Sequence, residues 1–203
     1  MTKKAAAQAH AAAAVLQRGQ VREKGMEMVY IETKRLILRN YQPKDVNDYY
    51  EYMRLESTAL HEDFEPYSLS QCEQAVQSRL TDDSYLVAEL RDSGKVIGDL
   101  CYREGEYETY EIAYDFNENF GKKGYATEAC RALITHIFRE LGGRRLYVGC
   151  NEDNENSWRL LERLGFRREA HCLEDVAFKK DENGEPNYVN SYFYAMLRRE
   201  WKE

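Results

Sequence analysis

The chain has 203 residues, of which 43% are apolar and 32% charged, as is typical of one soluble globular domain or of one domain with an appendage. No run approaches the roughly 20 apolar residues of a membrane helix, and the start lacks the apolar block and cleavage site of a secretory signal, so we expect a cytoplasmic protein without membrane contact. The net charge is −7, and after Gly25 the remaining 24 basic and 35 acidic residues leave −11, which disfavours nucleic-acid binding and favours cationic substrates such as amines.

The cysteines and histidines are scattered along the chain. The five cysteines form no C-x-x-C pair and no spacing typical of a disulfide framework, so we expect reduced thiols. The four histidines are equally dispersed, and neither residue type offers the clustered ligands of a zinc site. The sequence therefore predicts no metal.

Residues 1–25 differ in composition from residues 26–203, because they are rich in alanine and basic side chains and end at Gly25. Alanine favours helix, but the apolar face is too narrow to form a core alone. We therefore predict an appendage, helical or disordered, followed by one domain. An upstream-translated or cloning-derived origin is favoured. A mitochondrial presequence is the alternative, since acids are absent until Glu23, although serines and recurrent arginines are lacking.

The first half of the domain predicts a strand, a helix and a three-stranded meander. Charged and apolar residues alternate over Thr33–Arg39, as in a half-buried strand, and a tyrosine-rich helix begins at Asp45. Two strands joined by a turn at Asp92–Gly94 and a third strand come next, at Ser84–Leu90, Lys95–Arg103 and Tyr107–Phe116.

The second half predicts alternating helices and strands. A helix over about Tyr125–Leu141 keeps one apolar face and ends at Gly142. A strand, a short helix closed by Gly165 and a final strand follow, at Arg145–Cys150, about Glu155–Leu164 and Tyr188–Arg198. This order is that of a mixed α/β domain.

The segment Phe120–Thr127 joins a predicted strand to the start of a helix, where unpaired N–H groups and the helix dipole create an anion site. Its glycines allow close approach of the backbone to oxygen atoms, and Lys122 and Lys123 add positive charge to an acidic domain. A solvated surface turn is the alternative interpretation. The segment matches neither G-x-x-x-x-G-K-[ST] nor G-x-G-x-x-G, so a P-loop and a dinucleotide site are excluded.

The segment Glu111–Ala129 resembles the acetyl-CoA motif of GNAT N-acetyltransferases, whose loop pattern is [QR]-x-x-G-x-[GA]. Gly124 and Ala126 occupy its small positions, whereas Gly121 departs from the usual Gln or Arg. A second block, from Asn151 to the L-G-F at Phe166, is similar to the pantetheine-side helix of that family. The opening Glu32–Arg39 and the closing Tyr192–Trp201 resemble the branch that contains ribosomal-protein N-terminal acetyltransferases.

The resemblance implies a central, mostly antiparallel sheet flanked by helices and splayed where acetyl-CoA binds. It also implies an acetyl-CoA-dependent N-acetyltransferase that acts on a protein N-terminal amine or a small amine, and it leaves a homodimer open. The residues it assigns to the cofactor are Phe116, Gly121, Lys122, Lys123, Gly124, Tyr125, Ala126, Thr127, Asn151 and Asn154.

Acetyl transfer needs a neutral amine, a polarised carbonyl and a protonated leaving thiolate. Glu111 lies where some related enzymes place a catalytic carboxylate, and a solvated strand glutamate is the alternative. Backbone N–H groups beside Phe116 are expected to polarise the carbonyl. Many GNAT enzymes protonate the thiolate with a tyrosine where this chain has Leu161, so Ser157 is the candidate acid; an ordinary first-turn serine is the alternative.

Two classes of function remain open from the sequence alone. The first is a transferase that moves acetyl directly to an amine, because no histidine is related in sequence to Cys150 in a way that argues for an acyl-enzyme. The second is a catalytically weak acetyl-CoA-binding module, which Gly121 and the missing tyrosine favour. The acceptor itself is not identified, since its cleft is expected to be formed by variable loops at His61–Ser70 and Glu169–Asn187.

Overall fold

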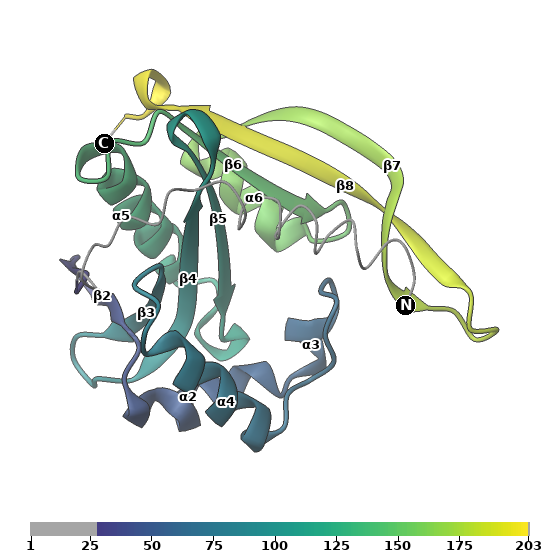
Figure 1. Ribbon diagram of the computed structural model, residues 1–203, viewed down its shortest axis with the longest axis horizontal. Helices are drawn as coiled ribbons and strands as arrows, with labels where there is room; N and C mark the ends of the chain where they lie inside the picture. The colour runs from purple at the N-terminus through teal and green to yellow at the C-terminus, as the bar shows by residue number, and fades with distance from the viewer. Residues whose placement is uncertain (1–27, 203) are drawn as a thin grey trace.

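The computed structural model describes residues 28–202, so the predicted extension at 1–25 lies outside the described residues and stays a prediction. Within them, eight strands form one sheet in the order β1-β2-β3-β4-β5-β6-β8-β7 (Figure 1). The strands are β1 (Tyr30–Glu32), β2 (Leu36–Asn40), β3 (Tyr85–Leu90), β4 (Val96–Glu104), β5 (Thr109–Phe116), β6 (Arg145–Asn151), β7 (Arg167–Lys180) and β8 (Pro186–Leu197).

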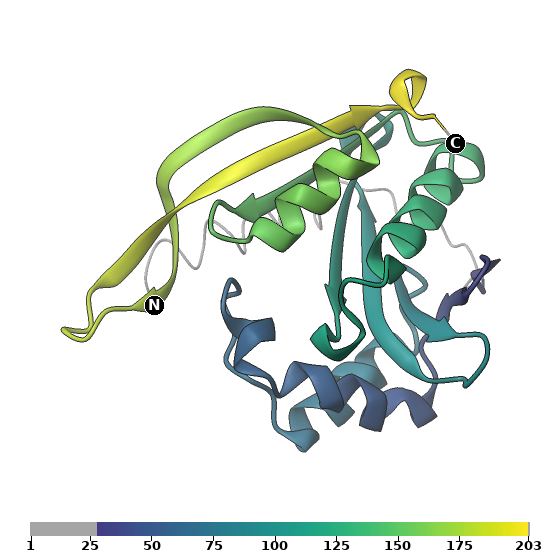
Figure 2. The same ribbon diagram turned by 180° about the vertical axis from the view of Figure 1, so that it is seen from behind.

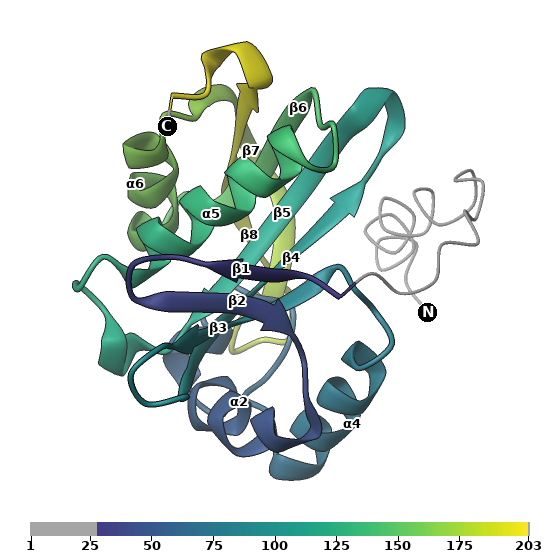
Figure 3. The ribbon, with the colours of Figure 1, turned by 90° about the vertical axis from the view of Figure 1, so that its left-hand side faces the viewer.

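Helices cover both faces of this sheet, and each face has its own core. On one face lie α5 (Tyr125–Arg139) and α6 (Glu155–Leu164), which are seen in front of the sheet in Figure 2. On the other lie α2 (Val46–Met53) and α4 (Leu69–Arg79), while the short α3 (Glu56–Ala59) sits between them in sequence. Figure 3 shows α5 above the edge strands and α2 and α4 below them. No helix of the described part is long and apolar enough to cross a membrane.

The predicted mixed α/β architecture is confirmed, and its physical basis is visible in the burial pattern. The strands β3 and β4 are buried on both faces, because Leu86 and Ala88 pack against the α5 and α6 side whereas Val87 and Val96 pack against α2 and α4. Helix α5 buries one apolar stripe and exposes the other side, as its sequence periodicity predicts.

The sheet is antiparallel except between β5 and β6, and these two strands separate soon after they meet. Their parallel pairing covers only Thr109–Glu111 of β5 against Arg145–Tyr147 of β6. Beyond this point β5 remains paired with β4 as far as Phe116, and β6 with β8 as far as Asn151. The expected splay is therefore confirmed, and it opens a wedge between the two strands (Figure 1).

Four elements differ from the sequence prediction, among them α3, which lies in a stretch where no element was predicted. The expected loop Glu169–Asn187 is mostly the strand β7, whose register against β8 shifts at three places, so that its side chains do not alternate regularly. Helix α4 escapes prediction because only Cys72 and Val76 are buried along it, although Ser68 and Gln71 form the capping box that starts it. The edge strand β1 is too short for a periodicity signal.

Candidate active site

The segment between β5 and α5 forms a loop with unpaired main-chain N–H groups. Lys122 and Gly124 have left-handed backbones, with φ of 59° and 80°. Within residues 28–202, the main-chain N–H groups from Lys122 to Thr127 have no hydrogen-bond acceptor; the first N–H of the helix to be paired is that of Glu128, which donates to the Gly124 carbonyl at 3.0 Å. Six consecutive unpaired donors at a helix start form an anion site.

The loop is held in place by a charged clamp from the start of the chain. Arg35 donates to the Lys123 carbonyl at 2.8 Å, and its Nε donates to Glu128 Oε2 at 2.7 Å. The Thr33 hydroxyl donates to the other Glu128 oxygen at 2.7 Å. Burial is the largest single effect on Glu128 and favours its neutral form, but the hydrogen bonds from Thr33 and Arg35 together outweigh it and lower the pKa of Glu128. The clamp is therefore ionised at neutral pH.

The departure at Gly121 has a steric reason. A Cβ placed on Gly121 would lie 2.9 Å from the Glu118 carbonyl oxygen, because residues Glu118–Phe120 form a tight 3-10 turn just before it. A positively charged side chain reaches this part of the cleft from α6 instead. Arg163 lines the same cleft as Lys122, and its Nη1 donates to the Thr127 hydroxyl at 3.2 Å.

The wedge between β5 and β6 exposes main-chain donors of β5. The Asn117 N–H donates to the Ile97 carbonyl at 2.9 Å, and Phe116 is opposite Gly98. In an antiparallel pair, this pattern directs the N–H of Phe116 away from β4, and the same holds for every second residue before it. The N–H groups of Tyr114 and Phe116 therefore face the side from which β6 has departed, beyond the last paired residue, Glu111.

Two hydroxyl groups meet inside the wedge. Tyr114 Oη lies 3.0 Å from Ser157 Oγ on α6. Burial raises the pKa of Tyr114 well above its usual range, so its hydroxyl stays protonated. The nearby Cys150 thiol has a pKa raised by burial to about 11, with Ser157 opposing the rise, which is why this thiol is a poor nucleophile.

Asn151 and Asn154, which the sequence assigns to the cofactor, also shape the chain beside it. The Asn154 side-chain oxygen accepts from the Ser157 N–H at 3.1 Å and caps α6, and the Asn151 oxygen accepts from the Asp153 N–H at 2.8 Å. Both residues line the cleft. Leu161, where many related enzymes have a tyrosine, is fully buried in the core and has no access to the wedge.

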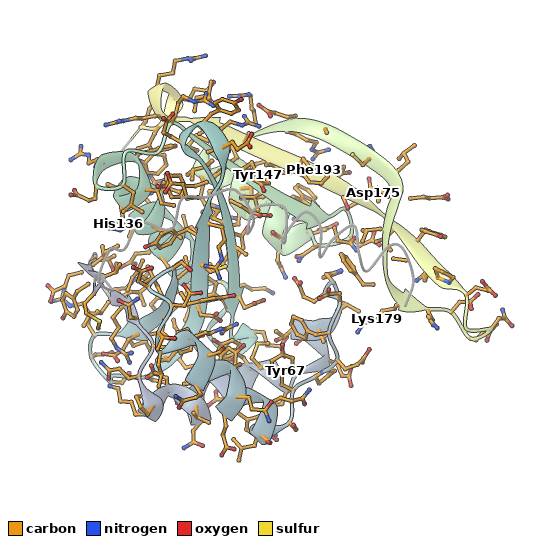
Figure 4. All side chains as sticks on the ribbon, in the orientation of Figure 1. Tyr67, His136, Tyr147, Asp175, Lys179 and Phe193 are labelled. Carbon is orange, nitrogen blue, oxygen red and sulfur yellow. The ribbon has the colours of Figure 1, made fainter. Side chains whose placement is uncertain are left out.

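The loop, the wedge and the space beyond it form one cleft of about 1140 Å³. Its far end is closed by the segment after α3 and by the β7–β8 arch, which are joined where the Lys179 ammonium donates to the Phe64 carbonyl at 2.8 Å. Figure 4 shows Asp175, Lys179 and Phe193 on this arch and Tyr67 below it. The acids lining the cleft beyond the wedge are Glu62, Asp115 and Asp175.

Comparison with known proteins agrees with this geometry. The family model described as "Acetyltransferase (GNAT) domain" matches residues 35–167. This chain belongs to the GNAT acetyltransferase family. The N-acetyltransferase YnaD of Bacillus subtilis is 31% identical over 176 residues, which cover 85% of this chain and 99% of that protein.

Solved structures share the GNAT fold. An acetyltransferase of the GNAT family from Bacillus anthracis superposes with a TM-score of 0.78 at 24% identity, covering 85% of this chain and all of that one. A spermidine N-acetyltransferase from Vibrio cholerae, in complex with CoA and spermine, superposes with a TM-score of 0.69 at 18% identity, covering 83% of this chain and 98% of that one.

The GNAT fold brings most of the predicted residues together but leaves two of them, Lys123 and Glu111, outside the cleft lining. Phe116, Ser157 and the two asparagines line the cleft, as do the loop residues except Lys123, whose carbonyl is bound by the clamp. Glu111 does not line the cleft. It lies on the exposed side of β5 beside Tyr147, whose pKa is raised to about 12 by burial and then by the Glu111 charge.

The sequence missed Tyr114, Asp115 and Glu62 as site residues. Tyr114 and Asp115 stand inside the recognised motif, so the available signal was their position in the last residues of a strand that precedes the loop. Glu62 lies in the segment His61–Ser70 that the sequence assigned to the acceptor cleft, but no pattern singled out this residue within it.

Proposed function

We propose that this GNAT enzyme transfers acetyl from acetyl-CoA directly to the nitrogen of a cationic amine, either a protein N-terminal amine or a small amine. The observation that carries the proposal is the separation of charge along one cleft. Its loop end is lined by three cations, Lys122, Arg159 and Arg163, and one acid, Glu118, and its far end by three acids, Glu62, Asp115 and Asp175. Phosphates are attracted to the first end and ammonium groups to the second.

The residues at the loop end fit acetyl-CoA. Enzymes of this family use acetyl-CoA, and when bound it supplies a thioester that an amine can attack. The unpaired N–H groups from Lys122 to Thr127 would hold its pyrophosphate, with Arg163 nearby. The N–H groups of Tyr114 and Phe116 would donate to a carbonyl oxygen in the wedge, which is the electrostatic contribution expected of an oxyanion site.

Ser157 and Tyr114 would serve the leaving group. When Tyr114 donates its proton to Ser157, the serine O–H is available to a sulfur in the wedge. A hydroxyl donor at that place stabilises negative charge that develops on the thiolate. The two residues come from β5 and α6. Their hydroxyl groups would take the role of the tyrosine that many GNAT enzymes have at the position of Leu161.

An acetyl-CoA-binding module without turnover is the alternative function that Gly121 and the missing tyrosine favour in the sequence. Gly121 is required by the turn before it, which leaves no room for a side chain. Leu161 is a core residue, and the hydroxyl that a tyrosine would supply there can come from Tyr114 and Ser157. Neither departure therefore argues against catalysis.

The test is release of CoA thiol from acetyl-CoA in the presence of three acceptors: spermidine, n-butylamine and a short peptide with a free N-terminal alanine. We expect turnover above the rate of spontaneous hydrolysis with at least one of them, and a mass increase of one acetyl group on that acceptor. Acetyl-CoA binding by calorimetry, accompanied by no thiol release with any acceptor, would instead support the binding module.

A further inference from the structure

Asp115, rather than Glu111, is the acid of β5 that lies beside the cleft, where a general base is needed. Side chains alternate along a strand, so Glu111, Ala113 and Asp115 share the face of the sheet that carries α2 and α4. Only Asp115 of the two acids lies in the part of β5 that has parted from β6, and only Asp115 lines the cleft.

Asp115 and Glu62 are half-buried acids at this end of the cleft, whereas Asp175 is exposed. The other acids inside this half of the molecule are neutralised: Asp99 accepts from Tyr52 at 2.7 Å and from Arg79 at 3.1 Å. Lys95 likewise pairs with two acids of α2, and Arg39 with a buried aspartate. Within residues 28–202, the carboxylates of Asp115 and Glu62 have no hydrogen-bond or ion-pair partner, and both residues line the cleft. A partly buried carboxylate without a partner favours its neutral form, and a cation that enters the cleft would stabilise its charged form.

The surroundings of Asp115 hold back its ionisation. Burial, followed by the charges of Asp99 and Glu62, raises the pKa of Asp115 to about 8, although Arg79 opposes the rise. Burial also raises the pKa of Glu62 to about 7. A pKa near the working pH is what an efficient general base requires. The other titratable side chains whose charges interact with that of Asp115 are Tyr49, Tyr67, Cys101 and Tyr114.

We propose that Asp115 and Glu62 form the binding site for the acceptor's ammonium group and that Asp115 accepts its proton, an assignment that rests on the acetyltransferase function proposed above. In this step an N–H bond of the ammonium breaks, an O–H bond forms on Asp115, and the electron pair stays on the nitrogen, which becomes a nucleophile. Asp115 later returns the proton to water.

The position of Asp115 suits this role because the next residue is Phe116, whose N–H is proposed to polarise the acetyl carbonyl. Its side chain faces the side of α2 and α4, whereas the N–H of Phe116 points along the edge of β5 into the wedge. An amine that enters from the acidic end of the cleft therefore meets Asp115 just before it reaches the carbonyl site.

The kinetic test compares Asp115→Asn with Glu111→Gln, and uses Glu104→Gln as a matched control that removes a charge from the exposed end of β4. With saturating acetyl-CoA and whichever of spermidine, n-butylamine and the alanine peptide the wild type acetylates, we expect kcat/KM of Asp115→Asn to fall about 10²-fold or more at pH 7. Glu104→Gln should be unchanged. A large fall in Glu111→Gln with little effect in Asp115→Asn would overturn the proposal. Equal acetyl-CoA affinity by calorimetry shows that Asp115→Asn is folded.

A second measurement does not depend on turnover. In protein labelled with ¹³C at aspartate carboxyls, the Asp115 signal should titrate near pH 8 in the wild type and at lower pH in Glu62→Gln, because one repelling charge has been removed. Adding n-butylammonium should also lower the titration midpoint. A midpoint near 4 that neither change moves would contradict the site, even if thiol release occurs. If the wild type releases no thiol, the proposed function fails, and this titration still decides whether the carboxylates bind an ammonium group.

Discussion

The hydroxyl oxygens of Tyr114 and Ser157 lie 3.0 Å apart across the wedge where β5 and β6 separate, although the two residues are 43 positions apart in the chain. The contact brings two hydroxyl groups into the wedge, whereas Leu161 has no hydroxyl and is buried in the core.

The pair is expected to act as one unit on the leaving thiolate. Tyr114→Phe and Ser157→Ala should each lower kcat on the order of 10²-fold, with little change in acetyl-CoA affinity, and the double variant should be no worse than the less active single one. Steady-state kinetics of the three variants test this. Tyr147→Phe, which loses a hydroxyl beside Glu111 outside the cleft lining, is the control. Multiplicative losses in the double variant would mean that the residues act independently.

Gly124→Asp should abolish most acetyl-CoA binding, with a loss in affinity of roughly 10-fold or more by calorimetry. The substitution strains a left-handed backbone with φ of 80° and places a carboxylate among the unpaired N–H groups that would face pyrophosphate. The matched control is Gly184→Asp in the β7–β8 turn, where φ is 81° and an added Cβ meets nothing within 4 Å. Similar affinities in both variants would refute the assignment of the loop.

Because Arg35 holds the loop in place, its loss is expected to lower acetyl-CoA affinity more than it lowers stability. Arg35→Met keeps an unbranched apolar side chain but removes the guanidinium, which lies over the Tyr125 ring and donates to the Lys123 carbonyl and to Glu128. We expect acetyl-CoA affinity to fall about 10-fold while the melting temperature falls by only a few degrees, because a charge-assisted hydrogen bond contributes roughly 1.5–3 kcal/mol. Lys34→Met, which removes an exposed cation from the neighbouring residue, is the control. A loss of stability without a loss of affinity would show that the clamp supports only the fold.

The raised pKa of Asp115 predicts that the free energy of unfolding depends on pH. Because the pKa of Asp115 is raised in the fold, its contribution to stability is complete below its unfolded value near 4 and is lost as pH rises through about 8. The free energy of unfolding of Asp115→Asn minus that of the wild type should therefore increase between pH 4 and 8, by at most about 1.4 kcal/mol per pH unit, and then stay constant. Chemical denaturation across this range measures it. A difference that does not vary with pH would mean that Asp115 titrates normally.

Much of this protein was determined by local sequence. The loop from Phe120 to Thr127 was recognisable because glycine at a left-handed position, two lysines and a helix start lie within eight residues. Helix α5 and the meander were predictable for the same reason, since an apolar stripe or a turn signal needs only a short window of the chain.

The sequence assigned His61–Ser70 and Glu169–Asn187 to the acceptor cleft, but only the tertiary structure decided which of their residues line it and which strand residue joins them. Glu62 and Asp115 come from a connecting segment and a strand that nothing in the sequence links, and the Arg35–Glu128 clamp spans 93 positions. Strand β7 was hidden because its register shifts disrupt the period of two on which strand prediction depends. Above all, which acid on β5 faces the cleft depends on where β6 departs from it. That departure follows Glu111 and leaves Asp115 beside the open wedge, because backbone pairing ends there and no residue type in either strand specifies the point.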